Sequence, residues 1–224
     1  MHPVRSLRSN SSWLPLVLGA ALTLVLPACG TSSTAISEAR AKATGTEVTV
    51  EGTVTVAPGD FASATGEQGF ALQDSSGGIY VTMTDKQSFG LGAKVRVTGT
   101  LDEMNMLRDL KAEPAQVELL SGTGQVTPKS VGTGAVNESV EGQLIKVSGK
   151  VSQTFQDDSP YGYKLYINDG SGEIQIFAHI SAGFDKAALQ ALTMNQQITV
   201  VGFTSQFNTT YEVAPRQPSD LTTP

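Results

Sequence analysis

The residues best suited to bind a ligand lie in the C-terminal half of the chain, where aromatic and polar side chains alternate with aliphatic ones. Lys164 and Tyr166 alternate with a leucine and an isoleucine, and Gln175 and Phe177 alternate with two isoleucines. A period of two is that of a strand with one buried face, so these four side chains should share the outward face of a hairpin. Exposed rings beside a lysine suit stacking on bases or on sugar rings.

The segments that flank this hairpin extend the candidate site. They add rings on both sides, and Arg216 belongs with Lys146, Lys150 and Lys164 to the chain's one notable group of cations, which alternates with acidic residues. The further candidate ligand-binding residues are Phe155, Tyr161, Tyr163, Phe207, Asn208, Tyr211 and Arg216. The aliphatic residues expected to point inward are Leu165, Ile167, Ile174 and Ile176.

Residues for catalysis or metal binding are scarce. His179 is the one histidine beyond residue 2, and no Gly-x-Ser-x-Gly or Gly-x-x-x-x-Gly-Lys motif occurs. Calcium could be held at Asp157-Asp158 or at Asp169, although aspartates in such turns more often cap the turn. We therefore expect a protein that is not an enzyme and holds no cofactor or metal.

The N-terminus has the features of an export signal. Arg5 and Arg8 precede the apolar run 13–26, which is too short to span a bilayer comfortably. The following Leu26-Pro-Ala-Cys29-Gly30 resembles the lipobox of bacterial lipoproteins, which implies acylation of Cys29 and anchoring in a cell membrane or outer membrane. An ordinary signal peptide with a chance cysteine is the alternative. We expect a signal peptide over 1–28 and a lipidated cysteine with a flexible tether over 29–35.

The acidic balance limits the choice of partner. The chain carries a formal charge of −6, and removing residues 1–28 takes away two arginines and leaves −8. Proteins that bind nucleic acid strands tightly normally present a basic groove that releases counterions. Any binding of single-stranded nucleic acid should therefore be weak and sensitive to salt.

Beyond the leader, one pattern occurs twice. Three blocks recur in the same order with similar spacing, which indicates two homologous domains over 36–122 and 127–222 with a linker at 123–126. The matching blocks are 48–54 with 145–151, 69–81 with 164–176, and 95–99 with 198–202. Alternating residues and Asp-Ser-Ser-Gly-Gly or Asp-Gly-Ser-Gly turns predict five short strands in each copy.

A helix is expected at 183–192, between the third and fourth strands of the second copy. Five strands with an optional helix at this position describe the OB-fold, a small Greek-key barrel. The phrases that carry this likeness are Glu51-Gly-Thr-Val, 72–81, 94–101 and 211–221, and they resemble secreted bacterial OB-fold domains of the nucleic-acid-binding type. An immunoglobulin-like sandwich would need about seven strands per copy. We therefore expect an all-β chain of two tandem five-stranded OB-fold barrels.

OB-folds usually bind through the outer face of strands two and three. In the first copy that face is poor in rings, because Tyr80 is accompanied only by Ala71, Gln73 and Gly78. We expect the second domain to bind and the first to act as a spacer or packing partner. The resemblance implies a membrane-anchored binding module of the cell envelope with nucleic acid as its ligand. A protein-interaction module that docks an envelope protein, or a glycan-binding module, is the alternative, and a hydrolase is a distant third.

Overall fold

The structure is a computed structural model that describes residues 1–2 and 32–223. Residues 32–223 belong to one compact unit, built mainly of strands. The predicted leader from residue 3 onward and the predicted lipidation site at Cys29 lie outside the described residues. Within the described residues, no helix combines the length and apolar character needed to span a membrane.

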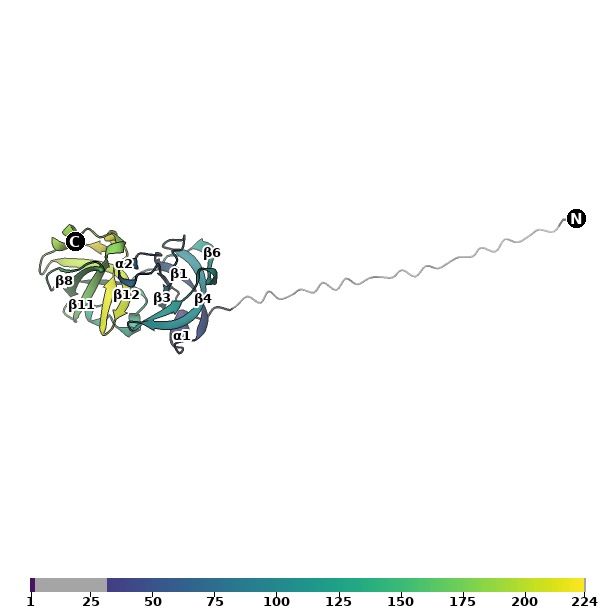
Figure 1. Ribbon diagram of the computed structural model, residues 1–224, viewed down its shortest axis with the longest axis horizontal. Helices are drawn as coiled ribbons and strands as arrows, with labels where there is room; N and C mark the ends of the chain where they lie inside the picture. Colours follow the sequence, from purple (N-terminus) through teal and green to yellow (C-terminus); the bar gives the residue numbers. More distant parts are fainter. Residues whose placement is uncertain (3–31, 224) are drawn as a thin grey trace. The chain divides into compact units, whose positions relative to one another are not determined.

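The first barrel closes from five strands, drawn in purple to teal in Figure 1. They are β1 (Glu47–Val56), β2 (Phe70–Gln73), β3 (Gly78–Thr82), β4 (Ala93–Met104) and β5 (Leu107–Lys111). The order is β1-β2-β3-β5-β4, and β4 returns to pair antiparallel with β1. Only β3 and β5 are parallel neighbours. This is a Greek-key barrel with OB-fold topology.

The second barrel repeats this arrangement. Its strands are β8 (Leu144–Val151), β10 (Gly162–Asn168), β11 (Glu173–His179), β12 (Gln197–Phe207) and β13 (Thr210–Ala214). β11 and β13 are parallel, and β12 closes the barrel on β8. Helix α3 (Lys186–Gln190) lies between the third and fourth barrel strands, inside the predicted range 183–192. The prediction of two tandem five-stranded OB-fold barrels is confirmed.

Several short elements surround the barrels. They are α1 (Ile36–Arg40), α2 (Ala62–Thr65), β6 (Val117–Thr123), β7 (Lys129–Ser130), β9 (Gln156–Asp158), β14 (Leu221–Thr222) and five 3-10 turns at Pro114–Gln116, Thr133–Ala135, Glu138–Val140, Ile180–Ala182 and Pro218–Asp220. β6 was not predicted, because its adjacent leucines 119 and 120 break the alternation, yet it pairs antiparallel with β4. It extends to Thr123, the first residue of the predicted linker.

The start of the described region differs from the predicted tether over 29–35. The amide N–H of Thr34 donates to the carbonyl of Thr49 at 2.7 Å, so the tether already joins β1 at this residue. The N–H of Ile36 then donates to the Asp74 carboxylate at 3.0 Å. Asp169 plays the same part in the second barrel, where it accepts the N–H of Thr133 at 3.1 Å. The sequence repeat therefore extends to the bond that ties each barrel's leading segment to its β-hairpin turn.

Each barrel has its own apolar core, and a third apolar cluster joins the two barrels. Leu165, Ile167, Ile174 and Ile176 belong to the second core, which confirms the predicted inward face. The third cluster comprises Val56, Phe61, Ala71, Tyr80 and Leu107 from the first barrel with Phe203 and Ala214 from the second. The outer face of β2 and β3 is thus packed against the second barrel, as the packing role predicted for the first domain requires.

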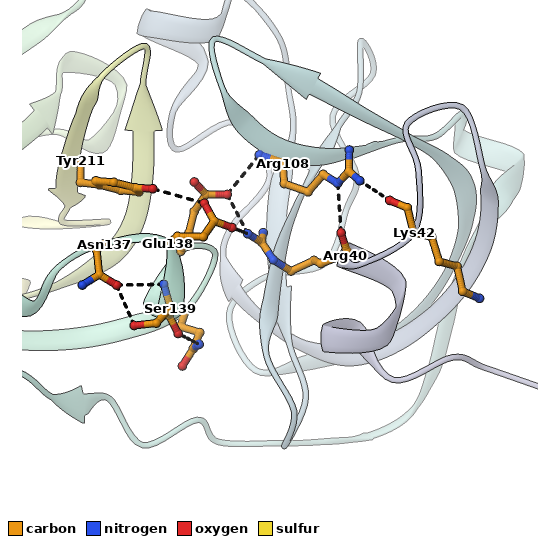
Figure 2. A network of polar contacts seen from close by, with 9 residues as sticks. Arg40, Lys42, Arg108, Asn137, Glu138, Ser139 and Tyr211 are labelled. Atoms are coloured by element: carbon orange, nitrogen blue, oxygen red, sulfur yellow. Dashed lines mark hydrogen bonds and ion pairs between the residues drawn. The ribbon is translucent and has the colours of Figure 1, made fainter.

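A network of charged groups spans the same junction (Figure 2). Arg40 of α1 donates to Glu141 at 2.8 Å and to Glu138 at 3.2 Å. The Glu141 carboxylate also accepts the backbone N–H of Arg108 at 3.1 Å, and the Tyr211 hydroxyl donates to Glu138 at 3.2 Å. Arg40 and Arg108 belong to the first barrel and its N-terminal helix, whereas Glu138 and Glu141 belong to the second domain. Their three contacts therefore fix the two barrels to each other.

Candidate functional site

The predicted binding face exists on the outside of the second barrel. In the pairing of β10 with β11, Lys164 lies opposite Phe177 and Tyr166 lies opposite Gln175. The Lys164 ammonium is 5.9 Å from the centre of the Phe177 ring, and the Tyr166 hydroxyl donates to Gln175 at 2.9 Å. These four side chains share a face, as predicted, while the residues between them fill the core.

A cleft of about 460 Å³ opens on this face. It brings together five of the predicted residues with four that were not predicted. The predicted ones are Tyr161, Lys164, Gln175, Phe177 and Phe207, and the others are Ala64, Asp158, Thr210 and Glu212. Ala64 belongs to α2 of the first barrel, so the docking of the two barrels completes the cleft.

Two aromatic rings stand at the rim of the cleft. Tyr161 is 51% exposed in the turn between β9 and β10, and Phe207 is 56% exposed where the β12–β13 hairpin turns. Phe177 lies deeper and is only 6% exposed. Tyr161 and Phe207 therefore place two solvent-accessible aromatic rings at the edge of the cleft.

The cleft wall carries a buried carboxylate, that of Glu212. It accepts a hydrogen bond from the Gln175 amide at 2.7 Å and one from the Ser205 hydroxyl at 3.0 Å. Burial raises the pKa of the Glu212 carboxyl, and these two bonds lower it by less. Tyr166 donates to Gln175, and Gln175 donates to Glu212. These hydrogen bonds hold the polar groups of the wall in fixed orientations.

The cations near the cleft are matched by acids. Lys164 forms an ion pair with Asp158 at 2.9 Å, and Lys186 forms one with Asp157. With Glu212 close by, the cleft offers no surplus of positive charge. A phosphodiester backbone would have to displace Asp158 before it could form an ion pair with Lys164.

Three predicted aromatic residues point away from this face. Tyr163 is part of the second core, and Phe155 packs on it with ring centres 5.6 Å apart. Tyr211 packs against the same core. The physical reason is parity. Tyr163 precedes the inward Leu165 by two residues, and Tyr211 precedes the inward Val213 by two, so each shares the inward side of its strand. Tyr163 is therefore a core residue and not part of a binding surface, whereas Phe155 and Tyr211 pack on the core and stay partly exposed.

Three other predicted residues serve the junction between the barrels instead. Tyr80 points outward from the first barrel, as predicted, but is 1% exposed because the second barrel covers it. Arg216 is paired with Asp220 through two of its nitrogens and donates with the third to the Thr55 carbonyl at 3.0 Å. Asn208 lies in the hairpin turn with φ of 53°, and its N–H donates to the Asn105 carbonyl.

The residues missed by the sequence prediction come from pairings that no local pattern reveals. Glu212 meets Gln175 because β11 and β13 are parallel neighbours in which these two residues are directly paired. The alternation around Val213 would have placed Glu212 outward, but not beside Gln175. Ala64 enters through the docking of the other barrel, for which the sequence carries no signal.

The residues considered for metal binding and for catalysis, Asp169 and His179, both serve local structure. Among residues 1–2 and 32–223, no group of three or more His, Cys, Asp or Glu side chains is arranged to hold a metal ion. Asp169 accepts bonds from Ser171 and Thr133, which lower its pKa, and it acts as a turn residue. His179 is buried and stacks on Phe61 with ring centres 4.2 Å apart.

Comparison with known proteins adds structural likenesses only. No protein-family model and no curated protein sequence matches the chain. A murine DNA-binding protein solved with ds DNA is 10% identical, with 74% of this chain and 90% of that one covered and a TM-score of 0.41. The tetrameric p202 HIN2 is 9% identical over 82% and 96%, with a TM-score of 0.40. OBody AM1L10, solved with hen egg-white lysozyme, is 15% identical over 45% and 98%, with a TM-score of 0.36. Likeness at this level carries no information about the ligand of this chain.

Proposed function

We propose that this chain is a non-catalytic binding module that holds its ligand in the cleft on the second barrel. The observation that carries the proposal is the pair of exposed rings, Tyr161 and Phe207, at the rim of a cleft whose wall bears oriented polar groups. Concave sites with apolar walls and a few fixed polar groups are the usual form of ligand sites. The burial of His179, the residue best suited to act as a base, supports the absence of catalysis.

The ligand class that fits this cleft best is a neutral glycan. Sugar rings present apolar faces to aromatic side chains and hydroxyl groups to amides and carboxylates. Tyr161 and Phe207 supply the former, and Gln175 and Glu212 supply the latter. The ion pair of Lys164 with Asp158 leaves the cleft without net positive charge, so a ligand without phosphate or sulfate groups meets no electrostatic penalty.

A glycan array tests this proposal. The full-length chain, solubilised in a detergent without sugar headgroups, should bind at least one neutral oligosaccharide, and its affinity should change little between 50 mM and 500 mM salt. Binding confined to sulfated or phosphorylated glycans, or lost at the higher salt, would overturn the choice of a neutral ligand.

Single-stranded nucleic acid is the second candidate, and one observation favours it. Lys146 and Lys150 are exposed on β8, and Lys150 lies opposite Asn168, next to the face that carries Tyr166. Among the described residues, neither lysine forms an ion pair. A labelled thymidine 20-mer should then bind weakly at low salt and dissociate at about 0.2 M. Replacing both lysines by glutamine should abolish that binding, and no binding at any salt would exclude this candidate.

We propose further that the module is exported and anchored to a cell-envelope membrane through acylated Cys29. The support is the lipobox-like sequence after a basic and apolar leader. A single acyl chain binds a membrane only marginally, whereas two or more hold it firmly. Cys29→Ser should abolish acylation and release the protein from membranes. A variant that remains membrane-bound and fully processed would show that the anchor is elsewhere. If neither glycan nor nucleic acid binds, cross-linking in these membranes would test an envelope-protein partner.

A further inference from the structure

A second, smaller cavity of about 180 Å³ lies between the two barrels. Its walls come from both barrels, and it shares Ala64, Phe207 and Glu212 with the cleft described above. Its other lining residues are Phe61, Thr65, Tyr80, Met104, Asn105, Leu107, His179, Phe203, Ser205 and Gln206. The cavity is therefore a separate space that adjoins the cleft.

Part of the wall of this cavity is aromatic. The ring centres of Tyr80 and Phe203 are 6.0 Å apart, and Phe61 lies 6.0 Å from Phe203 and 6.4 Å from Tyr80. Aromatic rings pack well against other rings at centre separations of 4.5 to 7 Å. A flat apolar guest can pack against the exposed faces of these rings.

Two buried polar side chains in the wall, those of His179 and Tyr80, have an atom without a hydrogen-bond partner among the described residues. His179 is 5% exposed, and the Nδ1 atom of its imidazole has no hydrogen-bond partner among the residues that the structure describes. Burial lowers the pKa of its imidazole to about 3, so the ring is neutral at physiological pH and has one donor and one acceptor. The hydroxyl of Tyr80, also buried, has no partner among the described residues either. Buried polar groups are almost always hydrogen-bonded, so these exceptions point to a ligand.

We propose that this junction cavity binds a small compound with one aromatic ring and one hydroxyl group, a phenol, whose hydroxyl bonds to His179. A cavity of about 150 Å³ with apolar walls accepts benzene, so one of 180 Å³ accepts a ring with a substituent. A phenolic hydroxyl both donates and accepts, and it satisfies either tautomer of the imidazole. The apolar ring meanwhile lies against Phe61, Tyr80 and Phe203. This proposal is independent of the glycan assigned to the cleft.

Fluorine NMR with 4-fluorophenol and 4-fluorotoluene tests it, using the full-length chain in micelles and micelles alone as the baseline. The two probes match in size and differ in the hydroxyl group. In the wild type both should bind. His179→Phe keeps the stacked ring but removes the polar atoms, so the ratio of phenol affinity to toluene affinity should fall about tenfold, the effect of one hydrogen bond.

Three further variants make the result decisive. His179→Gln keeps a donor and an acceptor and should preserve the preference for the phenol. Met104→Trp fills a partly exposed position that lines the cavity but not the cleft, and it should abolish binding of both probes. Lys164→Gln alters only the cleft and should leave both unchanged. Failure of both probes to bind the wild type, or an unchanged affinity ratio in folded His179→Phe, would overturn the proposal.

Discussion

The two barrels approach each other closely at two glycines, which provide a sharp test of how the barrels dock. A methyl group on Gly78 of β3 would lie 2.6 Å from the carbonyl carbon of Gly142 and closer still to its oxygen, whereas ordinary contacts begin at 3.4 Å. Both sides of this contact are backbone, so no side chain can rotate away. Overpacking costs about 1–3 kcal/mol, and Gly78→Ala should lose about 3 kcal/mol of unfolding free energy.

The neighbouring Gly77 supplies the control. A methyl group there would meet its nearest atom, the Ser37 nitrogen, at 3.6 Å, so Gly77→Ala should change stability by less than about 0.5 kcal/mol. Urea unfolding followed by circular dichroism measures both variants. With a slope of about 2–3 kcal/mol per M, Gly78→Ala should move the midpoint down by about 1–1.5 M. Equal midpoints for the two variants would refute this account of the junction.

Three further predictions concern buried charged groups, and each is measured by urea unfolding. Arg40→Met leaves the Glu141 carboxylate without its ion-pair partner and should cost about 3 kcal/mol of unfolding free energy. The double variant Arg40→Met/Glu141→Leu should recover part of this loss. Equal stability of the double and single variants would contradict this prediction. Burial and the nearby Asp109 raise the pKa of Glu67 from 4.5 to about 7, so the folded state keeps a proton that the unfolded state releases. Stability should therefore fall as pH rises from about 4.5 to 7, and Glu67→Gln should remove that slope. Burial lowers the pKa of His179, so its contribution is lost as pH falls from 6.5 towards 3, and His179→Gln should flatten this acid limb.

The sequence predicted the features that depend on local periodicity. Alternation placed Leu165 and Ile167 inside and Lys164 and Tyr166 outside, and the repeated blocks indicated two similar barrels. Alternation extended two residues back from Leu165 would have placed Tyr163 in the core rather than on a binding loop. That error came from assigning the residue to a loop although it lies in β10.

What the sequence could not predict depends on contacts between distant segments. Tyr80 faces outward from its barrel, and only the docking of the second barrel buries it. Glu212 reaches Gln175 through the parallel pairing of β11 with β13, which has no signature in either strand. Arg216 looks like a free cation in the sequence but is held by Asp220 four residues later. Candidate surfaces drawn from one domain alone therefore included residues that the junction buries.

The proposed ligand site is the cleft with Tyr161 and Phe207 at its rim. The most direct measurement is the affinity of the full-length chain for the best neutral oligosaccharide from the array, compared among Phe207→Ala, Tyr161→Ala and Leu119→Ala. Leu119 is as exposed as the two rings but lies on β6 of the first barrel, so it is the matched control. Truncating a ring that anchors a ligand costs more than about 1 kcal/mol. We predict at least a fivefold loss for each ring and none for Leu119→Ala; equal affinities in all three variants would contradict the assignment of the cleft.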